Sequence, residues 1–78
     1  MKMRIAIDSI SKVKEFNARA VNFPCKINIV SDRYVVDGRS LMGLFSLDLS
    51  KPVEMEFNEI HSDLAKLCFG RFEVKNEN

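Results

Sequence analysis

Residues 39–47 read Arg39-Ser40-Leu41-Met42-Gly43-Leu44-Phe45-Ser46-Leu47. Serine is a preferred residue just before a helix, because its side-chain oxygen accepts a hydrogen bond from a free amide of the first turn. We therefore predict a short helix after Ser40. Its apolar residues are too dense for one narrow buried stripe, so we expect part of this apolar surface to remain exposed.

The residues before this stretch predict a strand, a helix and a hairpin. Apolar residues alternate with polar ones from Met3 to Asp8, as in a strand with one buried face. Polar side chains at Asp8, Ser9 and Ser11 can cap a following helix. Its apolar face is predicted as Ile10, Val13, Phe16, Ala20 and Phe23, and Pro24 ends it. A hairpin follows, with strands around Ile27–Ile29 and Tyr34–Val36 and a turn at residues 31–33.

The residues after this stretch predict one more strand and one more helix. Pro52 opens a strand in which Val53, Met55 and Phe57 share one face. Asn58 caps a final helix. The buried face of that helix is predicted as Ile60, Leu64, Leu67, Cys68 and Phe72. Residues 75–78 are predicted to be a frayed tail of a single domain spanning residues 1–78.

This β-α-β-β-α-β-α order predicts an α+β two-layer sandwich, in which helices cover one face of a four-stranded antiparallel sheet. A chain of 78 residues is too short for a second domain or for a deep catalytic cavity. Neither a cluster of catalytic side chains nor a phosphate-cradling glycine loop is present, so we expect a binding scaffold rather than an enzyme.

Composition excludes several further classes. A net charge of +1 disfavours nucleic-acid binding, although residues 1–40 sum to +4 and residues 41–78 to −3, which hints at a basic face. No apolar run is long enough to span a membrane or to form a signal peptide, so we expect a cytoplasmic protein. With one histidine and only Cys25 and Cys68, we expect buried reduced thiols, no metal site and no cofactor.

The run at residues 39–47 resembles the Lys-Ser-Ile-Met-Gly-Leu-Met-Ser-Leu segment of HPr, the histidine-containing phosphocarrier family of the bacterial sugar phosphotransferase system. The resemblance extends without gaps over about residues 3–57, and the last helix agrees in pattern. It implies a divergent member with the family's open-faced sandwich and the strand order 1-4-2-3. Asp48, Pro52 and Arg33 stand where the family usually has glycines, which leaves the loop geometry open.

The family's phosphocarrier chemistry requires the motif Gly-(Leu/Ile)-His-x-Arg-Pro-Ala at the start of the first helix. In this chain the histidine, arginine and proline positions hold Ser9, Ser11 and Lys12. A serine phosphoester cannot replace the phosphohistidine, because its phosphoryl-transfer potential is far lower. The single histidine, His61, falls early in the final helix at an expected solvated position. We therefore expect no phosphocarrier activity.

The resemblance implies a different role for Ser40. It matches the serine that an ATP-dependent kinase phosphorylates in HPr proteins of Gram-positive bacteria, where the modified protein is a corepressor for a catabolite-control transcription factor. Phosphate at a helix N-terminus is favoured by free amides and the helix dipole, and Arg39 is adjacent. The alternative is that Ser40 is only a helix cap.

Leu41, Met42 and Phe45 fall on the family's partner-binding positions, beside Arg39 and Lys12. They predict an exposed docking patch on a basic face, unless one of the three turns inward.

The first functional hypothesis is a regulatory protein whose partner is a transcription regulator, an HPr kinase or a sugar-system enzyme. The second is a degenerate HPr-like module reused for docking or self-association outside sugar transport. A ferredoxin-like RNA-binding domain has little support, because Tyr34 is the only aromatic residue expected in a central strand.

Overall fold

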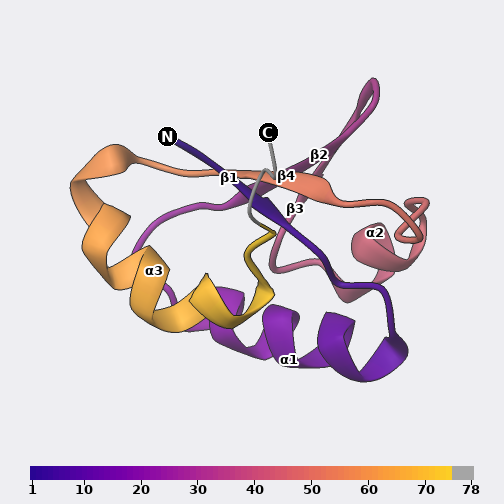
Figure 1. Cartoon of the computed structure of the whole chain (residues 1–78), viewed down its shortest axis with the longest axis horizontal. Coiled ribbons are helices and arrows are strands. Elements are labelled where there is room, and N and C mark those ends of the chain that lie inside the picture. Colours follow the sequence, from indigo (N-terminus) through magenta and orange to yellow (C-terminus); the bar gives the residue numbers. More distant parts are fainter. Residues whose placement is uncertain (75–78) are drawn as a thin grey trace.

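The computed structural model describes residues 1–74, and the predicted frayed tail at residues 75–78 lies outside the described residues. Four strands form one antiparallel sheet with helices on one of its faces (Figure 1), as predicted. The strands are β1 (Lys2–Ile5), β2 (Asn28–Ser31), β3 (Tyr34–Asp37) and β4 (Val53–Glu56). The helices are α1 (Ile10–Val21), α2 (Leu41–Phe45) and α3 (Ser62–Phe69), with 3₁₀ turns η1 (Glu59–His61) and η2 (Gly70–Phe72) on either side of α3.

The strand order is β1-β4-β2-β3, which is the order implied by the HPr resemblance. Met3 pairs with Met55, and Met55 pairs with Ile29 on its other side, so the alternating apolar residues form one continuous buried face. The opposite face carries charged side chains on β1 and β4. Lys2 lies 4.0 Å from Glu54 and 3.8 Å from Glu56, but exposed pairs of this kind contribute little stability.

A segment near the C-terminus pairs with the outer edge of β1. The Ala6 amide donates to the Phe72 carbonyl at 2.8 Å, and the Val74 amide donates to the Arg4 carbonyl at 2.9 Å. Ile5 and Glu73 form an antiparallel bridge between these bonds. The edge of β1 is therefore covered by the chain itself.

The β2–β3 hairpin turns through Asp32 and Arg33. Asp32 has φ of 55°, the left-handed region that aspartate tolerates better than most residues. The positive φ falls on Asp32, and not on Arg33, so an arginine at position 33 does not strain the turn.

Large aromatic side chains join the helices to the sheet. Phe16 of α1 packs against Phe69 of α3 with ring centroids 5.0 Å apart, and Phe72 lies 6.0 Å from Phe16. Phe23 packs against both Phe69 at 5.4 Å and Phe57 at 6.5 Å. Such aromatic pairs stabilise a fold beyond the area they bury.

The predicted buried face of the final helix was wrong in part. The structure buries Ala65, Phe69 and Phe72, whereas Ile60, Leu64 and Leu67 are exposed and Cys68 is half-buried. The segment carries apolar residues at two sets of helical spacing, and Phe69 buries a larger surface than Leu67 does. The helix is therefore rotated to place the aromatic side chain inside.

Two smaller predictions also need correction. Ile10 was expected on the buried face of α1 but is exposed, because it begins the helix beyond the covered part of the core. Cys25 and Cys68 are free but half-buried, not fully buried.

No helix of residues 1–74 is long and apolar enough to cross a membrane.

The packing makes a test of helix orientation possible. We expect Phe69→Ala to lower the free energy of unfolding by about 3–5 kcal/mol, because it removes a fully buried ring. Leu67→Ala, two residues away and exposed, should change it by less than about 0.5 kcal/mol. Urea unfolding followed by circular dichroism measures both. Equal losses in the two variants would contradict this orientation of α3.

Candidate functional site

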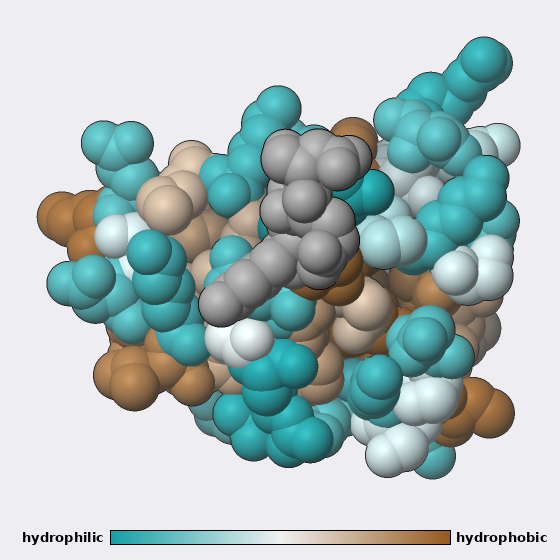
Figure 2. Space-filling view, in the orientation of Figure 1, coloured by the Kyte–Doolittle hydropathy of each residue, from teal (hydrophilic) through white to brown (hydrophobic). Residues whose placement is uncertain are grey.

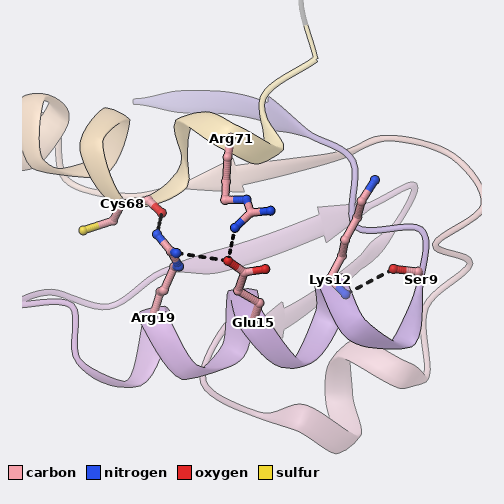
Figure 3. Close-up of polar contacts among 6 residues, drawn as sticks. All are labelled: Ser9, Lys12, Glu15, Arg19, Cys68 and Arg71. Carbon is pink, nitrogen blue, oxygen red and sulfur yellow. Dashed lines mark hydrogen bonds and ion pairs between the residues drawn. The ribbon is translucent and has the colours of Figure 1, made fainter.

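The start of α1 holds the three positions where the family resemblance places its catalytic motif. Ser9 is the cap of α1, and its Oγ accepts a hydrogen bond from the Lys12 amide at 3.1 Å (Figure 3). Ser11 and Lys12 are exposed in the first turn. The hydroxyl of Ser9 is thus used to satisfy a free helix amide.

The Lys12 side chain turns back toward the strand end. Its Nζ donates to Asp8 Oδ1 at 3.2 Å, an exposed pair one helical turn apart. The hydrogen bond from Lys12 lowers the pKa of Asp8 below its ordinary value. Lys12 therefore presents its charge together with a neighbouring carboxylate.

Ser40 occupies the equivalent position on α2. It is exposed, and its Oγ accepts from the Gly43 amide at 3.1 Å. A Cβ atom on residue 43 would lie 3.1 Å from Ser40 Oγ and 3.3 Å from Val36 Cβ. Glycine at this position therefore allows the first turn of α2 to close against both the cap and β3.

Arg39 is held by Asp37 on the approach to α2. Its Nε and Nη2 donate to the two carboxylate oxygens of Asp37 at 3.2 and 3.0 Å, and its backbone amide donates to Oδ1 at 2.9 Å. The Arg39 guanidinium holds the pKa of Asp37 below its ordinary value. The basic face predicted beside Lys12 and Arg39 is therefore reduced, because each of these two cations has an acidic neighbour.

The apolar residues of α2 divide between core and surface. Met42 is 84% exposed and Phe45 is 44% exposed, as expected for part of this run. Leu44 is buried, and Leu41 turns inward to pack against the core. Of the three predicted docking residues, only Met42 and Phe45 present a large apolar surface.

A shallow groove of about 290 Å³ lies between the start of α1 and the segment that follows α2. It brings Ser9 together with Phe45, two of the predicted site residues, and adds Ile10, which the sequence interpretation had placed in the core. Its lining residues are Ile7, Asp8, Ser9, Ile10, Val13, Phe45, Leu47, Leu49 and Ser50. The lining does not include the other predicted residues, which are Ser11, Lys12, Arg39, Ser40, Leu41 and Met42.

His61 is far from this groove. Its ring packs edge-on against Phe23 at 5.9 Å, beyond the C-terminal end of α1, so it is half-buried and not solvated as expected. Ser9 caps the other end of the same 12-residue helix, about 18 Å away along its axis. His61 is therefore not placed to act at the start of α1.

A charged cluster on α1 was not predicted. Glu15 Oε2 accepts from Arg19 at 3.0 Å and also from Arg71, and Arg19 donates to the Cys68 carbonyl at 2.9 Å (Figure 3). The Glu15–Arg19 pair has the i,i+4 spacing that a sequence shows, whereas Arg71 lies 56 residues away. The cluster joins α1 to the end of α3. Within residues 1–74 no group of three acidic, histidine or cysteine side chains is arranged to hold a metal ion.

Known structures resemble this one closely. Phosphocarrier protein HPr from Bacillus anthracis str. Ames superposes with a TM-score of 0.64 and 21% sequence identity, over 87% of this chain and 92% of that chain. HPr-C-His from Thermoanaerobacter tengcongensis superposes with a TM-score of 0.63 and 25% identity, over 90% of this chain and 96% of that chain. Comparison with protein-family models and with curated proteins found no match. The HPr-like sandwich fold is confirmed.

The Asp37–Arg39 pair predicts a pH effect. We expect Arg39→Gln to raise the pKa of Asp37 toward its ordinary 3.8, because the main stabilising hydrogen bond is lost. A carboxyl with a lowered folded-state pKa stabilises the fold above its ordinary pKa and loses this contribution as the pH falls through the lowered value. NMR titration of the Asp37 carboxyl carbon measures the shift.

Arg33→Gln is the matched control, because Arg33 is an exposed arginine in the turn of the same hairpin, at the other end of β3 from Asp37. It should leave the Asp37 titration unchanged. Equal shifts in the two variants would show that the pKa responds to net charge and not to this pair.

Proposed function

We propose that this protein is an HPr-like regulatory binding protein of the bacterial sugar phosphotransferase system, and that it is not an enzyme. In this proposal a single domain in the cytoplasm binds a protein partner through α2, and phosphorylation of Ser40 controls the binding. The supporting observation is that the exposed Ser40 hydroxyl caps the helix that also presents Met42 and Phe45 to solvent. A charge added at Ser40 therefore changes the surface on which a partner docks.

Loss of histidine phosphoryl transfer is the first element of the proposal. It is supported by the use of Ser9 Oγ as a helix cap at the position of the family's histidine. It is also supported by the distance of His61 from that position, since the family's chemistry requires a histidine at the start of the first helix. The HPr fold can be kept without this activity, because a fold does not determine a function.

A switch at Ser40 is the second element. A phosphoserine carries about −1.5 to −2 charges at neutral pH and is favourable at a helix N-terminus. Asp37, three residues earlier, adds a carboxylate that Arg39 compensates. A phosphate on Ser40 would compete with Asp37 for the Arg39 guanidinium, so phosphorylation would redistribute charge over residues 37–40.

The docking surface is the third element. α2 exposes the apolar side chains of Met42 and Phe45. Next to them lies the shallow groove, which Phe45 lines together with Ile10. Exposed apolar clusters beside a groove are typical of protein-binding sites. The partner that fits is a protein with an apolar side chain to insert, such as the transcription regulators that bind Ser-phosphorylated HPr.

Treatment with a purified HPr kinase and ATP tests the switch. We expect one phosphate on the wild-type chain, shown by intact mass, and none on Ser40→Ala, whose cap loss should cost about 1 kcal/mol without unfolding the protein. Ser9→Ala, which removes the equivalent cap of α1, is the matched control and should still be phosphorylated. An unmodified wild-type chain beside a phosphorylated control HPr would refute the switch.

Phosphoryl transfer is tested separately with the donor enzyme of a sugar phosphotransferase system. The chain should take up no acid-labile phosphate, while a control HPr does. Labelling that disappears in His61→Ala would overturn the proposed loss of transfer.

Binding of the Ser40-phosphorylated chain to a purified catabolite-control regulator tests the docking surface. We expect Phe45→Ala to weaken binding by roughly tenfold or more, because truncation of an anchoring hot-spot side chain costs about 2 kcal/mol or more. Tyr34→Ala removes an exposed aromatic side chain on β3, outside the groove lining, and should leave the affinity unchanged. Isothermal titration calorimetry gives both affinities, and equal affinity for Phe45→Ala and wild type would exclude this surface.

A further inference from the structure

α3 and the turn before it carry apolar side chains on two opposite sides. Phe69 is fully buried against α1 and the sheet. Leu67 lies two residues earlier, about 200° around the helix, and is 81% exposed. Ile60 and Leu64, which precede it at the i,i+4,i+7 spacing, are 78% and 38% exposed. We call Ile60, Leu64 and Leu67 the outer stripe.

The outer stripe is separate from the docking surface on α2. Figure 2 shows hydrophobic side chains gathered at the left of the molecule, where Figure 1 places α3, while α2 lies at the opposite end. Single exposed apolar residues are normal on protein surfaces. Three large aliphatic residues in one row along η1 and α3, on the side turned away from Phe69, indicate a surface that another helix covers.

Charges flank the outer stripe on one side only. Glu59, Asp63 and Lys66 each precede a stripe residue by one position, so all three lie on the same flank. All three side chains are exposed, and none of them forms an ion pair with another of residues 1–74. The opposite flank holds His61 and Cys68, which are half-buried.

We propose that the outer stripe pairs with the outer stripe of a second copy of this chain, with the two α3 helices antiparallel about a two-fold axis at Leu64. In this arrangement Ile60 of one copy faces Leu67 of the other. Asp63 faces Lys66 of the other copy within one residue of register, which is about 1.5 Å along the helix. Lys66 thus falls between Glu59 and Asp63 of the second copy.

Charge complementarity selects this occupant and this direction. A two-fold axis perpendicular to the helix pair keeps the charged flank of each copy beside the charged flank of the other. A parallel pair would instead place Asp63 beside the neutral flank with His61 and Cys68. The stripe is smaller than the roughly 20–30 residues a side of a standard interface, so the pairing is weak, with a dissociation constant on the order of 0.1 mM.

Sedimentation equilibrium of the full chain, from roughly 20 µM to roughly 1 mM, tests the proposal. The wild-type chain should associate to a dimer, and Leu67→Gln should weaken the dimer by at least about tenfold. Met42→Gln is the matched control, because Met42 is equally exposed but lies on α2, and it should leave the dimer unchanged. A wild-type chain that stays monomeric, or a dimer lost only in Met42→Gln, would overturn the proposal.

A charge exchange tests the antiparallel direction. Lys66→Asp should weaken the dimer because three acidic side chains then meet three others across the axis. The double variant Asp63→Lys with Lys66→Asp should restore it, because each cation again faces an anion of the second copy. A double variant as weak as Lys66→Asp would overturn the antiparallel geometry. Circular dichroism confirms that each variant is folded before association is measured.

Discussion

The Phe16 ring packs against the Phe69 ring with 5.0 Å between centroids, and this contact holds α1 and α3 against the same face of the sheet. In a chain of this length folding buries only about 60% of the unfolded surface, so a few large side chains carry much of the core. The contact also sets the rotation of both helices. With Phe16 inward, α1 is oriented so that its start borders the groove beside Phe45, and with Phe69 inward, Leu67 points to solvent.

Most of the fold could be predicted from local patterns. Alternation at Met3 and Ile5 identifies β1, and the spacing of Val13, Phe16 and Ala20 identifies the buried face of α1. Each of these patterns indicates one buried face, because the opposite face is mainly polar. The final helix has two apolar rows that are equally periodic, so its pattern does not indicate which row is buried. Only packing against Phe16 selects the row that contains Phe69, and that contact joins residues 53 positions apart.

In the candidate site, too, some features could be predicted from the local sequence and others could not. The caps at Ser9 and Ser40 follow from residue type and position alone, since each serine bonds an amide three residues later. The Arg71–Glu15 pair and the approach of Ile10 to Phe45 depend on the tertiary arrangement, and sequence spacing carries no sign of them. The expected basic face was overestimated for a different reason. Composition counts Lys12 and Arg39 as cations, although each pairs with an aspartate that lies only four or two residues earlier in the sequence.

Because α2 is separate from the outer stripe, the two proposed surfaces could be occupied at the same time. A dimer built through α3 leaves α2 of both copies free, because the two elements lie at opposite ends of the molecule (Figure 1). Two docking surfaces would then be held at a fixed spacing, and a dimeric partner could contact both at once. The second contact would be intramolecular, so two weak interfaces would give an avidity that neither has alone. Self-association and partner binding would then reinforce each other without sharing a residue.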